Sequence, residues 1–493
     1  MAKRTTVSCL SSVARLDHAL IPNEEAPYSL PDNWCWVRID AIASIFTGNS
    51  INERVKEEKY AGRSDGLVYI ATKDISFDSV VDYETNVSIP LNEGFKIAPK
   101  DSTLLCIEGG SAGRKVGFIT QDVCFVNKLC AFVPINGINP KYLYYVIQSD
   151  TFKKQFDAKK HGLIGGVSVK EVSSIHIPLP PTEQQNLIVE YVESFFIKLD
   201  EAKEKVQEVF DGFESRKAAI LNRAFSGELT TAWRKSHSAI ENTTIKAVKE
   251  YSLSWTKKEQ RLLYDEQQKA TTLSMSDNHN WIKCTIGAVA RVNNGSTPSR
   301  QKVEYWNGNI PWVSSGEVRN NYIYDTLERI TKDGFENSSV KLLPIGTVLI
   351  AMIGEGKTRG QSAVLRIPAT TNQNVAAIIM DHGLIVGEYM WYWLQMNYSK
   401  NREKGSGSGQ QALNCQRVRE LEFVFPGYEE QKEIVRILDN LISKEQQAKE
   451  AAEAVIERID TTKKAILARA FRGELGTNDP TEESAVELLK RII

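Results

Sequence analysis

Several short motifs in this chain resemble catalytic loops, and each lacks part of what its chemistry needs. Residues 109–113 read GGSAG, the spacing of a nucleophile elbow, but that motif requires a helix after it. Residues 115–120 instead predict a strand. Gly356, Lys357 and Thr358 resemble the end of a phosphate-binding loop, yet Ala351 stands where the leading glycine belongs. Nucleophilic hydrolysis and nucleotide hydrolysis are therefore poorly supported.

Two further patterns are equally incomplete. Residues 139–142 read NPKY, which is similar to the amino-group clamp of methyltransferases but lacks its central proline, and no glycine-rich cofactor loop precedes it. The six histidines form no metal-ligand spacing. We therefore expect no catalytic residues, no metal ligands and no cofactor on this chain.

Binding chemistry is better represented, because two glycine-rich turns carry cations. EGGSAGRKVG includes Arg114 and Lys115, and IGEGKTRGQ includes Lys357 and Arg359. Glycine lets backbone N–H groups approach an anion, and the cations add positive charge. The alternative is a pair of surface hairpins whose charges are simply solvated.

A basic segment followed by a glycine-rich loop also occurs twice. The cations and histidine of these segments are Lys153, Lys154, Lys159, Lys160, His161, Lys400, Arg402 and Lys404. Such positions suit DNA phosphates, although a solubilising loop would look the same. Side chains able to contact DNA bases lie nearby: Gln373, Gln410 and Gln411 suit adenine, and Arg114 and Arg359 suit guanine. Lys128 is a further candidate for DNA binding.

Composition limits the classes of protein to consider. The 493 residues carry a net charge of −1, so any anionic partner must be held by local patches. The seven cysteines are scattered and form no CxxC, which favours reduced thiols in the cytoplasm over a disulfide framework or a zinc site. No apolar run reaches the length of a membrane span.

The elements that position these residues are written twice. KAAILNRAFSGEL ends at Leu229 and KKAILARAFRGEL ends at Leu475, an offset of 246 residues. The same offset relates Pro180 to Pro426 and Gln185 to Gln431, with no gap between. A fixed internal period of this kind indicates a duplicated structural unit.

Each copy predicts one long amphipathic helix of about 42 residues. Apolar residues recur in alternating steps of four and three, which is typical of a coiled-coil seam. Seam positions are Ile188, Val192, Phe195, Leu199, Val206, Val209, Phe213 and Ile220 in the first copy and Ile434, Leu438, Leu441, Val455, Ile459 and Ile466 in the second. Arg216, Glu445 and Thr462 interrupt the seam with polar side chains. Thr182 with Gln185 fits a capping box, and Gly227 and Gly473 follow as helix stops.

The predicted fold class is α+β: two similar mixed domains separated by two long helices that pair as an antiparallel coiled coil with pseudo-twofold symmetry. Short apolar strands broken by Gly, Asn and Asp fill both domains. The predicted segments are an arm (1–33), a first domain (34–181), a first helix (182–229), a polar connector (230–280), a second domain (281–427), a second helix (428–475) and a tail with a short helix (476–493).

This layout resembles the specificity (S) subunit of type I restriction-modification systems. Each helix opens with P-x-x-E-x-Q and closes with A-x-x-G-E-L, and LTTAWRK at 229–235 also looks like a family feature. The resemblance implies two target recognition domains that each read half of a split DNA site, with the helices setting the gap. It also implies partner methyltransferase (M) subunits, two per complex, and restriction (R) subunits, which would hold S-adenosylmethionine, ATP and Mg.

Two other functions stay open at this point. A single-chain enzyme that modifies DNA would need a catalytic domain, and the connector of about 50 residues is too short for one. A scaffold whose duplicated domains bind protein would share the same architecture. A bipartite methylation motif in the host genome separates these hypotheses.

Overall fold

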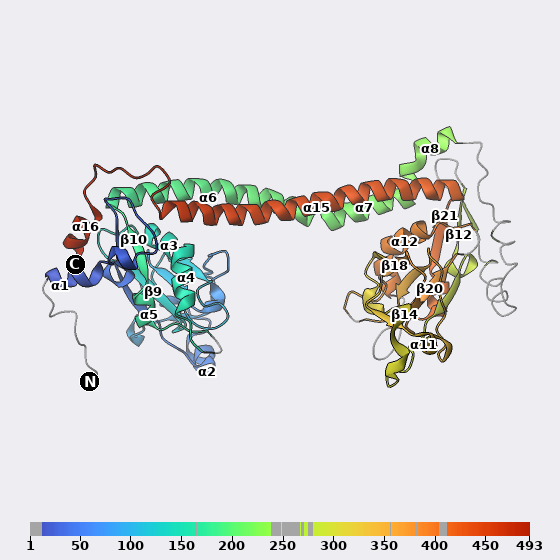
Figure 1. Cartoon of the computed structure of the whole chain (residues 1–493), viewed down its shortest axis with the longest axis horizontal. Helices are drawn as coiled ribbons and strands as arrows, with labels where there is room; N and C mark the ends of the chain where they lie inside the picture. The colour runs from blue at the N-terminus through green and yellow to red at the C-terminus, as the bar shows by residue number, and fades with distance from the viewer. Residues whose placement is uncertain are drawn as a thin grey trace. The chain divides into compact units, whose positions relative to one another are not determined.

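The computed structural model describes residues 12–162, 165–237, 271–274, 280–354, 356–380, 383–403 and 412–493, together with Val248 and Gln267. The chain divides into two compact units, Met1–Glu208 with Ala452–Ile493 and Val209–Ala451. Each unit contains one mixed domain and segments of both long helices (Figure 1). The two units are described separately below as unit 1 and unit 2.

The domain of unit 1 is built from short strands in three sheets. They are β1 Cys35–Arg38, β2 Ala43–Thr47, β3 Leu67–Ile70, β4 Ser88–Ile89, β5 Ile97–Ala98, β6 Thr103–Cys106, β7 Val116–Phe118, β8 Val123–Phe125, β9 Leu129–Pro134 and β10 His176–Leu179. The sheet orders are β2-β9-β6-β7, β4-β3-β8-β5 and β1-β10. Only the β3–β8 pair is parallel. Strand β6 is central and fully buried, as its continuous apolar run predicts.

Helices cover this domain: α1 Ser12–Ala19, α2 Glu53–Val55, α3 Pro140–Gln148, α4 Asp150–Ala158, α5 Val169–Ser173 and α16 Ala485–Ile492. Helix α3 begins where Asn139 accepts hydrogen bonds from the backbone N–H groups of Lys141 and Tyr142. The single helix predicted from Pro140 to about Lys160 is instead two helices. Ser149 ends the first and caps the second by accepting from Phe152 N.

The domain of unit 2 contains β11 Thr271–Ser274, β12 Asn280–Thr285, β13 Arg291–Asn294, β14 Trp306–Val313, β15 Asn321–Ile323, β16 Glu328–Ile330, β17 Val348–Ala351, β18 Ser362–Leu365, β19 Thr370–Thr371, β20 Val375–Ile379 and β21 Glu422–Phe425. Its sheets are β13-β20-β17-β18-β15, β16-β14-β19 and β11-β12-β21. The described helices are α8 Thr231–Ser236, α11 Lys332–Glu336, α12 Gly387–Met396, α13 Tyr398–Glu403 and α14 Cys415–Arg419.

The two domains share a framework, as the repeat predicts. The order β2-β9-β6-β7 recurs as β13-β20-β17-β18. Gly48 and Gly295 each pass so close to a neighbouring backbone that an added Cβ would lie 1.9 Å from a carbonyl oxygen. The next residue in each case donates its backbone N–H to that same carbonyl, at 2.9 Å. Glycine is thus required at the same place twice.

The first long helix is α6 Thr182–Asp211 followed by α7 Phe213–Phe225, and the second is the continuous α15 Tyr428–Ala470. The long helix predicted in the first copy is therefore present, with a bend at Gly212. Glycine is a weak helix former, and the Arg216 guanidinium donates to the Val209 carbonyl next to the bend, at 3.0 Å. Gly227 and Gly473 follow the helix ends in the left-handed region, which confirms both predicted stops.

Helix pairing is antiparallel within each unit, as predicted. In unit 1, Lys203 pairs with Asp460 at 2.9 Å, and Asp200 pairs with Lys463. In unit 2, Arg216 pairs with Glu445 at 2.9 Å. Partner numbers fall as residue numbers rise, which defines opposite chain directions.

Each domain is also clasped by the end of the helix from the other copy. Tyr142 packs edge-on against Phe471 with ring centroids 5.6 Å apart, and Tyr389 packs the same way against Phe225 at 5.1 Å. Both tyrosine hydroxyls donate to a strand carbonyl, that of Pro178 and that of Val424. The repeat is therefore close enough to duplicate individual hydrogen bonds.

Parts of the seam differ from the predicted positions. Phe195, Val209 and Val455 are exposed, while Ile188, Val192, Phe213, Ile434, Leu438 and Ile459 are buried. Leu199, Val206, Ile220, Leu441 and Ile466 are half-buried. Phe196 packs against the core where Phe195 was expected, because it faces the Tyr145 ring at 5.7 Å. A strict heptad repeat thus misplaces the apolar face by one residue here.

The predicted capping box of Thr182 and Gln185 does not form. The Gln185 side chain is buried, where it accepts from Asn139 N at 2.9 Å and donates to Pro180 O at 3.0 Å. Gln431 repeats this arrangement with Val386 N and Pro426 O. The shared glutamine therefore binds its own domain to its helix. Within the described chain, no helix combines the length and apolarity needed to cross a bilayer.

Candidate nucleic-acid interface

Three loop segments of unit 1 meet at one end of β6. The Ile107 backbone N–H donates to Lys128 O at 3.0 Å, and its carbonyl accepts from Val167 N at 3.0 Å. The turn that begins at Gly109 closes when Gly113 N donates to Cys106 O at 2.9 Å. The predicted glycine-rich turn, Lys128 and the glycine-rich loop after α4 are therefore brought together.

Helix α4 lies directly beneath this turn. A Cβ added at Gly113 would lie 2.7 Å from the Phe156 ring, so the turn rests on that helix. Strand β7 follows the GGSAG sequence, so the structure has a hairpin here instead of the strand–turn–helix of a nucleophile elbow. Acyl-transfer chemistry has no support at this site.

The cations of the unit 1 turn are held by an aromatic ring. The Arg114 guanidinium lies 4.8 Å and the Lys115 ammonium 5.1 Å from the centroid of Phe77, a residue that is exposed. Lys115 also donates to Thr72 O at 2.9 Å. Cation–π stacking fixes the direction of both charges without cancelling them. No sequence signal identified Phe77, because it lies in an irregular loop with no repeat partner of the same type.

Two of the predicted basic residues already have acidic partners. Lys160 pairs with Asp157 at 2.6 Å, and His161 bonds to Glu171 at 2.6 Å. The pKa of Glu171 is lowered to about 2, first because the Ser168 hydroxyl and backbone N–H donate to it and then because of His161. The carboxylate therefore stays ionised and holds the His161 ring by a hydrogen bond.

The remaining cations of unit 1 are more available to a phosphate. Lys128, Lys153 and Lys154 are exposed, and no ion pair joins them to another residue of the described chain. Lys159 ends α4 and is half-buried. Lys128, Lys153 and Lys154 stay the strongest phosphate-binding predictions in this domain.

Unit 2 repeats the meeting of loops at the end of β17. Met352 N donates to Asn374 O at 2.9 Å, and Leu413 N donates to Met352 O at 2.9 Å. The backbone pairing aligns Asn374, not Gln373, with Lys128. The same strand end thus collects the same three segments in both domains.

Helix α13 fixes the glycine-rich turn of unit 2. The Tyr398 hydroxyl donates to Lys357 O at 2.6 Å, and the Arg402 guanidinium donates to Arg359 O at 3.0 Å. Lys357 and Lys400 are exposed, whereas Arg359 is only 7% exposed. Arg359 is therefore placed to hold the turn, and the prediction that it contacts guanine loses its basis.

Gln373 is exposed, and its side-chain oxygen accepts a hydrogen bond from the Thr297 hydroxyl. That bond orients the amide through its oxygen, and the NH2 group takes no part in it. Thr297 was missed by sequence reasoning, although it follows the repeated glycine turn at Gly295. Lys404, Gln410 and Gln411 lie outside the described residues.

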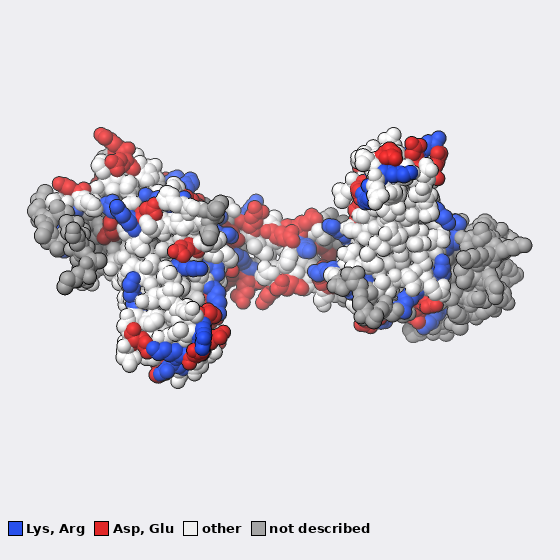
Figure 2. All heavy atoms as spheres, turned by 90° about the horizontal axis from the view of Figure 1, so that it is seen from below, with Lys and Arg blue, Asp and Glu red and all other residues white. Residues whose placement is uncertain are grey.

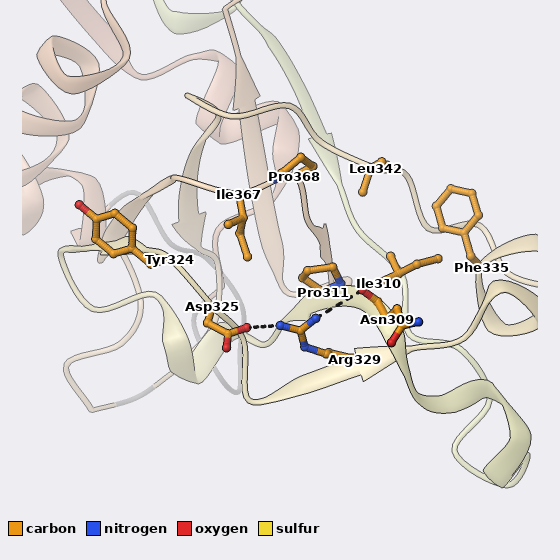
Figure 3. A pocket seen from close by; sticks show the side chains of 10 residues that line it. All are labelled: Asn309, Ile310, Pro311, Tyr324, Asp325, Arg329, Phe335, Leu342, Ile367 and Pro368. Atoms are coloured by element: carbon orange, nitrogen blue, oxygen red, sulfur yellow. Dashed lines mark hydrogen bonds and ion pairs between the residues drawn. The ribbon is translucent and has the colours of Figure 1, made fainter.

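A cavity of about 580 Å³ opens in the unit 2 domain (Figure 3). Its walls are mostly apolar, and its polar lining residues are Asn309, Tyr324 and the Arg329–Asp325 ion pair, at 2.6 Å. No Ser, Thr, Cys, His or Lys is among the described residues that line it. Among the described residues no three His, Cys, Asp or Glu side chains are grouped to hold a metal ion.

The net charge of α6 is opposite to that of the loops. Helix α6 carries eight acidic and three basic side chains. Figure 2 shows acidic side chains gathered along the helical stretch, with Lys and Arg scattered over the domains. Because like charges repel, DNA phosphates are favoured at the domain loops over α6.

Comparison with known proteins gives a consistent result. A family model described as the type I restriction modification DNA specificity domain matches residues 31–209 and again 278–458. The specificity subunit of the StySPI enzyme from Salmonella potsdam is 22% identical over 473 residues, covering 90% of each protein. That of EcoBI from Escherichia coli is 22% identical over 498 residues, covering 94% of this chain and 92% of the relative.

Solved structures show the same fold. The HsdS subunit from Thermoanaerobacter tengcongensis aligns with a TM-score of 0.53 and 16% identity, covering 92% of this chain and all of that one. A chain from a study of complex assembly and conformational transition in a type I R-M system aligns with a TM-score of 0.66 and 17% identity, covering 91% and 100%.

Proposed function

This chain belongs to the family defined by the type I restriction modification DNA specificity domain, and from that premise we propose how it selects its DNA. It is the non-catalytic specificity subunit of a restriction-modification enzyme. The observation that carries the proposal is the duplication: the family domain occurs twice, and each copy gathers three loops at the end of its central strand. Two such sites per chain suit a DNA target in two parts.

We assign the two target recognition domains to residues 34–181 and 281–427. In each, exposed cations beside the loops contact phosphates and fix the domain's register on the duplex. Base contacts then come from the loop tips, where Arg114 and Gln373 are held by Phe77 and Thr297. The side chains at these tips differ between the domains, as reading two unlike half-sites requires.

The paired helices set the gap between the half-sites. Helix α15 has 43 residues, which corresponds to about 65 Å of helix at ~1.5 Å per residue. A rigid element of this length exceeds one turn of DNA, about 34 Å, so it can carry two readers to successive positions on one face of the duplex. The acidic surface of α6 keeps the helices themselves off the phosphates.

A stripe on α6 fits a partner protein. Leu187, Tyr191 and Phe195 are spaced four residues apart on one helical face, and all three are exposed. The Tyr191 and Phe195 rings lie 5.2 Å apart. An exposed apolar stripe on an acidic helix suits an amphipathic helix with basic flanks. We assign this face to one of two methyltransferase subunits.

The docking assignment is tested by Leu187→Ser with Tyr191→Ser. We expect co-purification of the methyltransferase subunit to fall at least ten-fold while DNA binding by the chain alone is unchanged. Ile197→Ser is the matched control, because Ile197 is exposed on α6 but lies off the stripe. Equal loss in both variants, or none in the first, rejects the assignment.

The DNA-recognition function is tested by mapping methylated bases in a host genome with and without this gene. We expect one bipartite motif with a fixed gap, and we expect it to disappear when the gene is deleted. A motif that survives deletion, or a continuous motif, contradicts the proposal. The measurement needs no knowledge of which bases are read.

A further inference from the structure

Two ion pairs in unit 2 join the unlike copies of the repeat. Arg216 meets Glu445 at 2.9 Å, and its guanidinium also stacks 4.4 Å from the Phe213 ring. Arg234 meets Glu430 at 2.6 Å, with only 12% and 5% of the two side chains exposed. Arg216 lies in the first copy of the helix and Arg234 just after it, and both glutamates belong to the second copy.

The equivalent positions in unit 1 are uncharged. The offset of 246 residues relates Glu445 to Leu199, Arg216 to Thr462 and Glu430 to Gln184. Where Glu430 accepts from Arg234, Gln184 donates to the backbone carbonyl of Asp479 at 3.0 Å. The seam is apolar in both copies, and some equivalent positions, such as Ile188 and Ile434, hold the same residue. Unit 1 has its own ion pairs between the copies, Lys203–Asp460 and Asp200–Lys463, so what sets unit 2 apart is charge at Arg216, Glu430 and Glu445.

The difference matters because the helices of two molecules could exchange partners. If the second copies of two chains paired together, Glu445 would face Thr462 and Glu430 would face the Asp479 carbonyl, which offers no donor. If two first copies paired, Arg216 would face Leu199. Arg234 and Glu430 are buried, so an exchange that separates them is strongly destabilising, whereas the Arg216 and Glu445 side chains are 40% and 28% exposed and losing that pair costs less. Both exchanges are therefore disfavoured.

We propose that these two ion pairs are a pairing code that keeps the two unlike halves of one chain together. The code rests on the proposed function, because a chain of unlike halves carries two different readers and so recognises an asymmetric site. Exchange between molecules would instead join two identical readers. The code specifies the partner, whereas the seam supplies most of the contact area.

The test moves one charge between copies without changing composition. In Leu199→Glu with Glu445→Leu, like copies become complementary and unlike copies do not. Two differently tagged full-length chains are co-expressed, and mixed complexes are measured by co-purification and by mass in solution. We expect at least ten-fold more mixed complex than in the unaltered chain and a doubled mass.

The rescue variant adds Arg216→Thr with Thr462→Arg, which makes unlike copies complementary again. We expect it to return to a single-chain mass. A merely stabilising role for the pairs would lower the unfolding temperature of the first variant without producing mixed complexes, and that result overturns the proposal. Failure of the rescue also overturns it.

If the first variant is insoluble, Arg216→Thr with Thr462→Arg is tested alone. In that variant the second copies of two chains become complementary, because the introduced arginine would face Glu445, and unlike copies do not. Mixed complexes there support the code, and a folded single chain rejects it. None of these measurements involves DNA. Their outcome is therefore distinguishable from that of the methylation map, which tests the proposed function.

Discussion

At the scale of single residues, the structure shows which basic side chains already have an acidic partner and which do not. Lys160 and His161 have carboxylate partners, whereas Lys153 and Lys154 have none among the described residues. The sequence predicted all four as one patch, because charge spacing along the chain contains no information about Asp157 or Glu171 folding back onto it. We therefore expect Lys153 and Lys154 to bind phosphates.

Replacing Lys153 and Lys154 with alanine is expected to weaken binding to all DNA sequences alike. Removing one lysine that neutralises a phosphate lowers the slope of log K against log salt by about 0.9, so the slope falls by about 1.8 if each lysine neutralises one phosphate. Binding titrations over a range of salt measure this. Lys100→Ala is the control, since Lys100 precedes β6 while the loops follow it. A changed sequence preference with an unchanged slope contradicts the assignment.

Replacing Gln373 with alanine is expected to act differently. An amide that contacts a base edge contributes about 1–3 kcal/mol of discrimination, so preference should relax at one base pair of one half-site while the salt slope is kept. Selection of binding sites from a randomised library measures the change. Thr297→Val should give a weaker form of the same effect, because it leaves the amide in place but removes the bond that orients it. Uniform loss across all positions argues against base contact.

At the scale of elements, the boundaries of the helices were predictable and some of their side-chain roles were not. The glycine after each end is a local signal, and both predicted stops were confirmed. Gln185 was assigned to a cap because it lies three residues after Thr182, yet it bonds across the fold to Asn139. Long-range partners of this kind leave no local pattern. Arg216 and Glu445 looked like interruptions for the same reason.

Replacing Arg234 with methionine tests the buried clasp at the start of α15. The change leaves the Glu430 carboxylate buried without its cation, although the Thr230 hydroxyl still donates to it, and losing one partner of a buried pair costs about 3–5 kcal/mol. We expect a lower urea midpoint for unfolding of unit 2. Adding Glu430→Gln should recover most of the loss, because the equivalent Gln184 is stable without a cation. No recovery in the double variant argues that Arg234 acts through packing alone.

At the scale of the whole molecule, the duplication predicted the architecture well. A period of 246 residues, gapless over the helices, implied two similar domains and two similar helices before any strand was located, and the shared sheet order confirms it. The loops were less predictable, since their sequences differ between the copies wherever the readers differ. Arg359 illustrates this: its position in a glycine-rich turn suggested a DNA contact, but its side chain is buried beneath that turn.

Lengthening both helices by seven residues should widen the recognised gap. Insertions after Ala202 and Ala448, which occupy equivalent positions, add about 10 Å to the paired helices, or about three base pairs at ~3.4 Å each. The half-site sequences should stay the same. Methylation mapping of a host that carries the variant reads out the new gap. Insertion into one helix alone is the control and should abolish recognition, because it leaves the two paired helices unequal in length and shifts the residues beyond the insertion away from their partners.

The bonds that anchor each domain to the helices point to how such proteins acquire new targets. Gln185 and Gln431 bind main-chain atoms of their domains, and Tyr142 and Tyr389 donate to main-chain carbonyls. Main-chain atoms are common to every sequence, so substitutions within a domain leave these attachments intact. Recombination between the two copies could therefore replace a whole domain in one event, and a lineage could change the invaders it rejects without rebuilding its enzyme.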